Sequence, residues 1–141
     1  MYDIIFVCTG NTCRSPMAEA IAASLKPEAN FTSMGVAAHE GSPASPNACL
    51  AMEKEGLTLE GHTSKTITAN HLKNAKLILT MTQNHLSYVK NIYPNANAYT
   101  LAGYAGKEKD ISDPFGGGLE TYMRCAKEIK ALIEVCLFER I

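Results

Sequence analysis

The stretch that decides the fold is IIFVCTGNTCRSP, at residues 4–16. It opens with four apolar residues that do not alternate with polar ones, which indicates a strand buried on both faces, as in a parallel sheet. It closes with Ser15 and Pro16, a pair typical of the N-cap and the first residue of a helix. The residues between this strand and this helix would form a loop at the carboxyl end of the strand, where open parallel sheets bind ligands.

The rest of the chain repeats this alternation of a short apolar run and a longer amphipathic run. We expect strands at residues 4–7, 31–36, 77–80 and 99–101, and helices at residues 17–25, 47–55, 83–92 and 119–138. Ser45 and Pro46 would begin the second helix and Gly56 would follow its end. With right-handed crossovers, this order predicts an α/β fold with a four-stranded parallel sheet flanked by helices on both faces. A chain of 141 residues has the size of one domain, so residues 1–141 should form a single one.

Composition and charge exclude several classes of protein. Hydrophobic residues make up 46% of the chain and charged residues 19%, a balance that excludes intrinsic disorder. Thirteen basic against 14 acidic residues leave a net charge of -1, without the excess of positive charge that nucleic-acid binders carry. No apolar run reaches the ~20 residues of a membrane span, and the N-terminus does not resemble a signal peptide. We therefore predict a cytoplasmic protein with no nucleic-acid or membrane partner.

Cys8 and Arg14 stand in the pattern C-x5-R-S, and no other cysteine of the chain has an arginine six residues later. A loop of this length between a strand and a helix can turn its backbone N–H groups toward one point, where the helix dipole adds positive charge. Gly10 and Asn11 are residue types that accept the positive φ of such a curl. We therefore expect a phosphate-binding loop between the first strand and the first helix.

The same loop carries the residues of a nucleophilic site. Cys8 would lie beneath the phosphorus atom of a bound phosphate ester, where the amide dipoles favour the thiolate. Ser15 can donate its hydroxyl to that sulfur and favour the anion further. Arg14 can offer two N–H donors to two phosphate oxygens, a match that lysine cannot reproduce. Cys8 is thus a candidate nucleophile, and Arg14 is a candidate catalytic residue that binds the phosphoryl group.

Asp113 is the candidate proton donor. It precedes Pro114 in the glycine-rich residues 103–118, which follow the last expected strand and so lie at the same edge of the sheet as Cys8. A leaving group needs a proton, and the water that later attacks a covalent intermediate must lose one, so a single carboxyl can serve both steps. We interpret Asp110, in the same loop, as a solvated charge.

Residues 7–20 resemble the N-terminal signature of the low-molecular-weight protein tyrosine phosphatase family, and Asp113-Pro114-Phe115-Gly116 resembles the acid-loop motif of that family. The resemblance covers essentially the whole chain. It implies a phosphatase without metal or cofactor that acts through a phosphocysteine on phosphorylated proteins, with phosphate or other oxyanions as product or inhibitor. The residues implied to bind the substrate are Thr9, Gly10, Asn11, Thr12, Cys13, Ser15 and Phe115.

The resemblance alone implies two further features. Ser33 and His62 match positions that, together with Asn11 and Ser15, hold the phosphate loop in shape in this family. Cys13 matches a cysteine that can form a protective disulfide with the nucleophile, which makes Cys8 and Cys13 a candidate redox pair.

Other interpretations of the motif are less well supported by the sequence. An arsenate reductase needs additional relay cysteines, and residues 81–94, where related reductases would carry them, contain none. A module that only binds phosphoproteins needs neither the nucleophile nor the acid. Five cysteines, an odd number, do not suggest a disulfide framework. Cys49, Cys125 and Cys136 lie in helical patterns typical of core positions, and the histidines show no ligand spacing with the cysteines, so we expect no metal site.

Two substrates are compatible with the resemblance. Thr12 stands where tyrosine-specific members usually carry a bulky aliphatic residue, and Phe115 is followed by two glycines in place of a further aromatic residue. Both features resemble the branch of the family that hydrolyses phosphoarginine in proteins. We therefore predict a protein arginine phosphatase, with phosphotyrosine as the alternative substrate.

Overall fold

The computed structural model of the protein describes residues 1–140. Its strands are β1 (Tyr2–Cys8), β2 (Phe31–Gly35), β3 (Ala75–Thr80) and β4 (Ala98–Thr100). Its α-helices are α1 (Arg14–Leu25), α2 (Pro46–Lys54), α3 (Ala69–Lys73), α4 (Gln83–Ile92), α5 (Leu101–Tyr104) and α6 (Leu119–Val135), and one turn of π-helix, η1 (Cys136–Arg140), continues α6. Among residues 1–140 we find no helix with the length and apolar character that crossing a membrane requires.

The strands form one parallel sheet in the order β2-β1-β3-β4, as the α/β prediction requires. The chain moves from β1 to one side to form β2 and then to the other side to form β3. The strand order therefore reverses between β1 and β3, and open α/β sheets bind ligands at such a point, outside the carboxyl ends of the strands. The loop after β1 and the first turn of α4 after β3 meet there.

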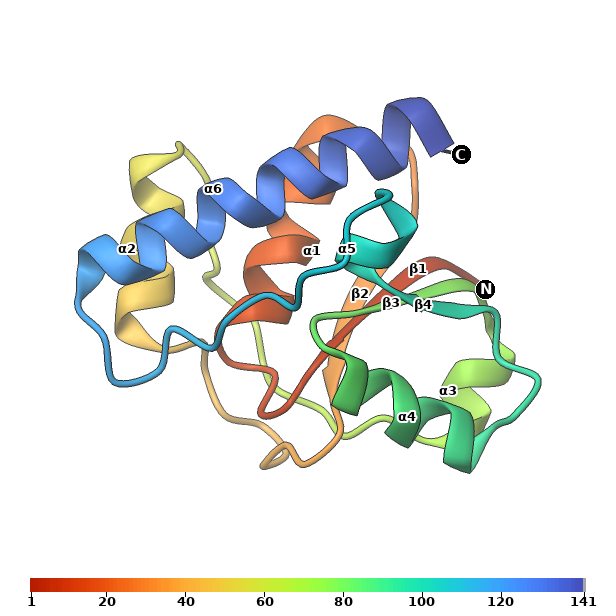
Figure 1. Ribbon diagram of the computed structural model, residues 1–141. Coiled ribbons are helices and arrows are strands. Elements are labelled where there is room, and N and C mark those ends of the chain that lie inside the picture. The colour runs from red at the N-terminus through yellow and green to blue at the C-terminus, as the bar shows by residue number, and fades with distance from the viewer. Residues whose placement is uncertain (141) are drawn as a thin grey trace.

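Helices cover both faces of the sheet, as predicted (Figure 1). Phe6 points to the face that α1, α2 and α6 cover, where it is fully buried in the larger core. Its neighbours Ile5 and Val7 belong to the second core, on the face that α3 and α4 cover. Successive residues of a strand point to opposite faces, so the uninterrupted apolar run of β1 supplies both cores.

The start of the first helix differs from our prediction. We expected Ser15 at the N-cap, but α1 begins at Arg14 and Cys13 occupies the N-cap. The Ser15 hydroxyl is not available to cap the helix because it lies 2.8 Å from the Cys8 sulfur. The second helix begins as predicted, with Ser45 at the N-cap and proline next. Its end is also as predicted, since Gly56 follows the C-cap with a φ of 76°.

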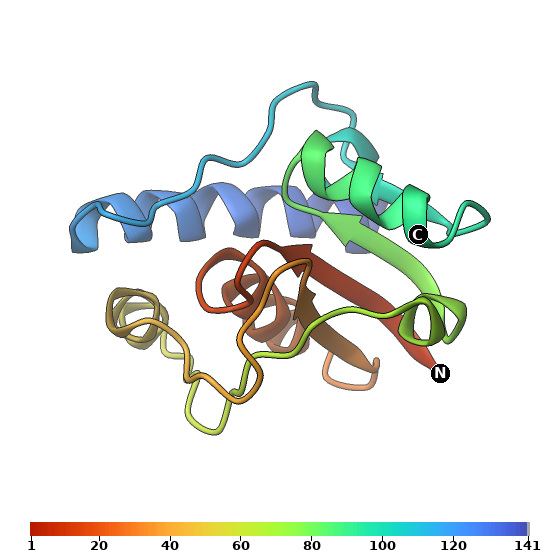
Figure 2. The ribbon, with the colours of Figure 1, turned by 90° about the horizontal axis from the view of Figure 1, so that it is seen from below.

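Two short helices, α3 and α5, were not predicted, and α5 begins at Leu101, where the prediction had the last residue of the fourth strand. Both depend on caps: Thr68 accepts a hydrogen bond from the backbone of His71, and Thr100 accepts one from that of Gly103. The segment from α5 to α6 crosses the same end of the sheet as the loop after β1 (Figure 2). This crossing brings Asp113 to the edge of the sheet where β1 ends.

Candidate active site

Cys8 is the last residue of β1, and it is a free thiol with a side chain that is only 3% exposed. Its Sγ atom lies 2.8 Å from Oγ of Ser15, which is itself fully buried. If Cys8 is a thiolate, it can only accept, so the serine hydroxyl donates to the sulfur. This contact requires α1 to begin where it does, with Ser15 in its first turn facing back to the end of β1.

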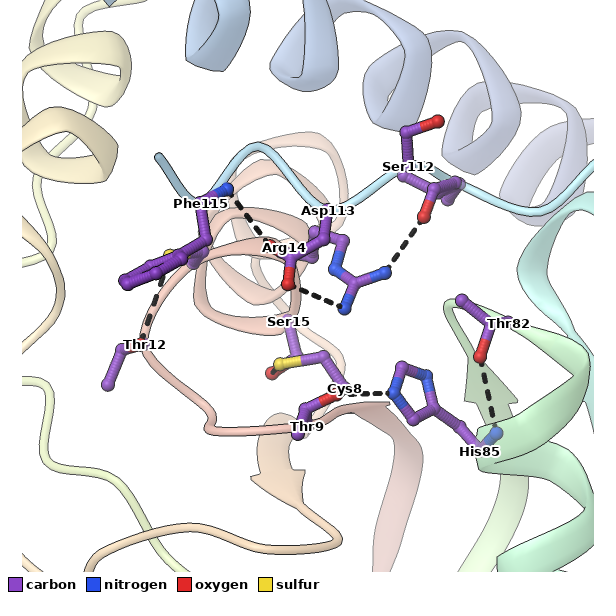
Figure 3. A network of polar contacts seen from close by, with 12 residues as sticks. Cys8, Thr9, Thr12, Arg14, Ser15, Thr82, His85, Ser112, Asp113 and Phe115 are labelled. Carbon is purple, nitrogen blue, oxygen red and sulfur yellow. Dashed lines mark hydrogen bonds and ion pairs between the residues drawn. The ribbon is translucent and has the colours of Figure 1, made fainter. Parts of the chain in front are cut away.

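The loop after Cys8 curls around the Cys8 and Ser15 side chains (Figure 3). The backbone N–H groups of residues 10–13 donate no hydrogen bond to any other described residue. Only Asn11 adopts the left-handed conformation, with a φ of 57°, whereas Gly10, which we had considered equally suited to it, does not. A curl with free amides at a helix N-terminus is an anion-binding arrangement.

Asn11 connects the loop to the rest of the fold. Its side-chain amide donates to Ser15 Oγ at 2.9 Å and to Ser33 Oγ at 3.0 Å. Its Oδ1 accepts from the backbone N–H of Lys65 at 3.0 Å, and its backbone oxygen accepts from His62 Nε2 at 2.7 Å. The residues implied by resemblance to support the loop thus lie in one hydrogen-bond network around Asn11. These bonds offset the cost of the left-handed backbone at a residue that is not glycine.

Sequence reasoning missed two residues that support this network. Glu19 accepts a hydrogen bond from Ser33 Oγ at 2.7 Å, so a carboxylate on α1 orients that hydroxyl. Gly35 lies against the loop backbone, because a Cβ atom there would stand 2.5 Å from the Thr9 oxygen and 3.1 Å from the Asn11 nitrogen. Only a residue without a side chain allows the loop to approach β2 this closely.

Arg14 joins the loop to the segment that carries Asp113. Its Nη1 donates to the Ile111 backbone oxygen at 2.8 Å, and its Nη2 lies 3.7 Å from Asp113 Oδ2. The Arg14 side chain is 6% exposed, whereas that of Asp113 is 54% exposed. Oδ1 of Asp113 accepts from the Phe115 backbone N–H at 3.0 Å (Figure 3). The arginine is therefore held from one side and the aspartate is held at its base, while the carboxyl group still reaches solvent.

These groups line a cleft of about 230 Å³. Its lining residues are Cys8, Thr9, Gly10, Thr12, Cys13, Arg14, Asp113 and Phe115. The ring of Phe115 is 80% exposed and stands at the mouth of the cleft, near Thr12 (Figure 3). Every residue predicted to be catalytic or to bind substrate lines this cleft, except Asn11 and Ser15, which are fully buried behind it.

The second thiol of the loop faces a cluster of hydroxyl groups. Sγ of Cys13 lies 3.3 Å from Ser45 Oγ and 3.5 Å from Tyr122 Oη. Burial, together with the contact to Cys13, raises the pKa of Tyr122 to about 12. Nearby, burial raises the pKa of Cys125 to about 12, which fits the predicted core role of this residue. At neutral pH the Cys125 thiol is therefore protonated and a poor nucleophile.

His85 is a third residue that sequence reasoning missed at this site. It lies in the first turn of α4, its ring is 5% exposed, and its Nε2 lies 2.8 Å from Thr9 Oγ1. Burial, and secondarily the charge of Arg14, lowers its pKa from 6.5 to about 4, so the ring is neutral at pH 7. Its Nδ1 is buried without a hydrogen-bond partner.

Asp110 is not simply the solvated charge that we predicted. Its Oδ1 accepts a hydrogen bond from the backbone N–H of Gln83 at 3.0 Å, at the N-terminus of α4. A carboxylate in this position satisfies a free helix amide and interacts favourably with the helix dipole. The contact also ties the segment that carries Asp113 to α4.

The site as a whole combines a buried cysteine, free amides, a held arginine and a half-exposed aspartate at the carboxyl end of a parallel strand. This arrangement defines a cysteine-based phosphatase. Within residues 1–140, no group of three or more His, Cys, Asp or Glu residues is placed to hold a metal ion.

Comparison with known proteins assigns the family. The model of the low molecular weight phosphotyrosine protein phosphatase family matches residues 3–140. The chain is 39% identical over 137 residues to a protein-arginine-phosphatase of Geobacillus stearothermophilus, covering 94% of this chain and 92% of the relative. It is also 39% identical over 137 residues to the low molecular weight protein-tyrosine-phosphatase PtpB of Staphylococcus epidermidis, covering 96% of this chain and 97% of the relative.

A solved structure agrees with these relatives. The YwlE arginine phosphatase, a cysteine-to-serine mutant with a phosphorylated active-site serine, superposes with a TM-score of 0.90 at 36% identity, covering 94% of this chain and 91% of that one. The chain belongs to the low molecular weight phosphotyrosine protein phosphatase family. It is therefore a hydrolase of a family that uses a cysteine without a metal to act on phosphorylated proteins, as we predicted.

Proposed function

We propose that this enzyme removes phosphoryl groups from arginine side chains of proteins, through a phosphocysteine on Cys8. The observation that carries the arginine assignment is the position of the Thr12 hydroxyl in the wall of the cleft. Among the described residues, its Oγ1 has only one polar contact, a distance of 3.8 Å to the Cys13 sulfur. This hydroxyl is therefore available to a substrate that carries N–H donors.

In the first step, the Cys8 thiolate attacks phosphorus while the loop amides and Arg14 hold the phosphoryl oxygens. The S–P bond forms as the P–N bond of phosphoarginine breaks. Asp113, in its protonated form, gives its proton to the departing nitrogen. Arg14 uses one of its five N–H groups on Ile111, so the others remain for two phosphoryl oxygens.

In the second step, water attacks the phosphorus atom of the phosphocysteine. Asp113, now a carboxylate, takes a proton from that water, the S–P bond breaks and the Cys8 thiolate is regenerated. Ser15, which donates to the sulfur, stabilises the thiolate as it leaves. Inorganic phosphate is released, and it should bind the empty loop as a product inhibitor, as should other oxyanions of similar shape.

The loop-support residues act through the backbone in this scheme. Ser33 and His62 hold Asn11, and Asn11 in turn holds the loop in the curl that exposes its amides. Because the amides stabilise charge on the phosphoryl oxygens only where they already point at it, the network lowers the cost of reorganisation during the reaction.

Two observations support phosphoarginine over phosphotyrosine as the preferred substrate. The leaving group of phosphoarginine is planar and rich in N–H donors, and the Thr12 hydroxyl can accept from one of them. A departing guanidinium would also meet the half-exposed carboxyl group of Asp113, which lines the same cleft. Sequence similarity does not distinguish the two substrates, since a protein-arginine-phosphatase and a protein-tyrosine-phosphatase are both 39% identical to this chain.

The test is to measure kcat/KM in parallel on phosphoarginine and phosphotyrosine peptides of otherwise identical sequence, for the wild type and Thr12→Ile. An isoleucine would leave a desolvated N–H donor unpaired, at a cost of about 1 to 3 kcal/mol. Thr12→Ile should thus lower kcat/KM on phosphoarginine about 10- to 100-fold, while phosphotyrosine hydrolysis is unchanged or increases.

The conservative variant Thr12→Ser serves as the control, because it keeps the hydroxyl and removes only a methyl group. It should retain the preference for phosphoarginine. A wild type that prefers phosphotyrosine, or an equal loss of both activities in Thr12→Ile, would overturn the arginine assignment.

A further inference from the structure

A second cleft, of about 480 Å³, lies beside the reaction cleft, between α4 and the segment that carries Asp113. The two clefts share Thr9, Arg14 and Asp113 as lining residues. The second cleft adds His85, Tyr88 and Asp110, none of which takes part in the proposed phosphoryl transfer. In Figure 3, Arg14 and His85 stand on opposite sides of this space.

The charged groups of this second cleft leave it acidic while a substrate is bound. Arg14 is then committed to phosphoryl oxygens, and Asp113 carries the proton that the leaving group will receive. Asp110 retains its negative charge, and only one of its carboxyl oxygens is used, by the Gln83 backbone. The neighbouring Lys109 does not neutralise Asp110, because its ammonium group pairs with Glu128 at 3.9 Å.

The uncharged residues that line the cleft also suit a positively charged occupant. Tyr88 is 38% exposed, and the face of a tyrosine ring attracts cations. Burial lowers the pKa of His85 to about 4, so its neutral ring adds no positive charge to the wall of the cleft.

We propose that this cleft is a substrate subsite for a basic side chain, arginine or lysine, one or two residues away from the phosphorylated residue. The assignment rests on the proposed function, in that the substrate must be a protein. Because the clefts share Asp113, a neighbouring residue of an extended chain, which advances about 3.3 Å per residue, can reach the second while the phosphoryl group is in the first.

The experiment measures kcat/KM on peptides with Arg, Gln or Glu beside the phosphorylated residue, each made with phosphoarginine and with phosphotyrosine. The wild type should favour the Arg-flanked peptide over the Gln-flanked one by about 3- to 10-fold, mostly through KM. Asp110→Asn keeps an oxygen that can accept from Gln83 and removes the charge, so the preference should fall to within about 2-fold of unity. Hydrolysis of p-nitrophenyl phosphate, which has no flanking residue, should not change.

Two further variants sharpen the result. Tyr88→Leu should weaken the preference for the basic flank without changing the rate on p-nitrophenyl phosphate. Glu120→Gln is the matched control, because it removes an exposed carboxylate in the first turn of α6 that lines neither cleft, and it should keep the full preference.

The subsite proposal is wrong if the wild type does not distinguish the Arg-flanked from the Gln-flanked peptide, or if Asp110→Asn keeps the preference. It is also wrong if Asp110→Asn slows all peptides equally, because the carboxylate would then act on the leaving group itself. The proposed function fails differently: the absolute rates would favour phosphotyrosine peptides, while the ratio between flanks would still report on the subsite.

Discussion

The Nε2 atom of His85 lies 2.8 Å from Oγ1 of Thr9, the residue that follows the nucleophile. The phosphate loop is thus held from two directions: by His62 through the Asn11 backbone, and by His85 through a side chain from the other half of the sheet. Because β1 and β3 are neighbours, this contact spans the point where the strand order reverses.

The lowered pKa of His85 predicts a dependence of stability on pH. Since its pKa is about 4 in the fold and 6.5 without it, the unfolded chain binds more protons between these values. The free energy of unfolding therefore falls as the pH is lowered from about 6.5 to 4, by on the order of 2 kcal/mol from this group, and levels off below. His85→Gln, whose amide can still reach Thr9, should lose less stability over this range.

Urea titrations at pH 7 and at pH 4.5 test this directly, with the difference between the two pH values as the readout. Taking this difference removes any loss of stability that the substitution causes equally at both pH values. If the wild type and His85→Gln lose the same free energy of unfolding between the two pH values, His85 is not the buried neutral group that the structure indicates.

Asp113→Asn should slow turnover by about 10²- to 10⁴-fold, the usual contribution of a positioned proton donor. The loss should be smallest in the first step for leaving groups that need no proton. The measurement is a comparison of single-turnover rates for aryl phosphates with good and poor leaving groups. An equal loss for both would show that Asp113 does not protonate the leaving group.

The two thiols of the loop predict reversible oxidation. Peroxide oxidises the Cys8 thiolate to a sulfenic acid, and the Cys13 thiol then displaces water to form a disulfide. Dithiothreitol should restore the activity of the oxidised wild type, whereas Cys13→Ser should recover less because the sulfenic acid can be oxidised further. Peptide mapping should find the Cys8–Cys13 disulfide.

Cys125→Ser is the matched control for this experiment, because burial keeps the Cys125 thiol protonated. It should oxidise and recover like the wild type. A Cys13→Ser variant that recovers as fully as the wild type would argue against a protective disulfide.

The sequence predicted those features that depend on neighbouring residues. The apolar run before Cys8 and its spacing to Arg14 are local, so both the buried strand and the loop could be read directly. The predicted start of α1 was wrong because a tertiary contact, that of Ser15 with the Cys8 sulfur, overrides the local capping preference. Helices as short as α3 and α5 have too few residues to show a helical period.

The supporting residues of the site were harder to find for the same reason. His85 meets Thr9 across 76 positions, and Glu19 meets Ser33 across 14, so no spacing rule connects them. Gly35 matters because another backbone approaches it, and a sequence does not display such an approach. Residues implied by the family resemblance, such as Ser33 and His62, could be placed near the loop only because a pattern for the whole family exists.

The central claim, a phosphocysteine on Cys8, can be tested most directly by trapping it in Asp113→Asn. With p-nitrophenyl phosphate, the first step needs little help from an acid, while the second step has lost its base, so the intermediate should accumulate. Mass spectrometry of the rapidly quenched enzyme should find one phosphoryl group, on the peptide that contains Cys8, and Cys8→Ser should show no steady-state turnover. A phosphoryl group on another residue, or steady-state hydrolysis by Cys8→Ser, would contradict the account.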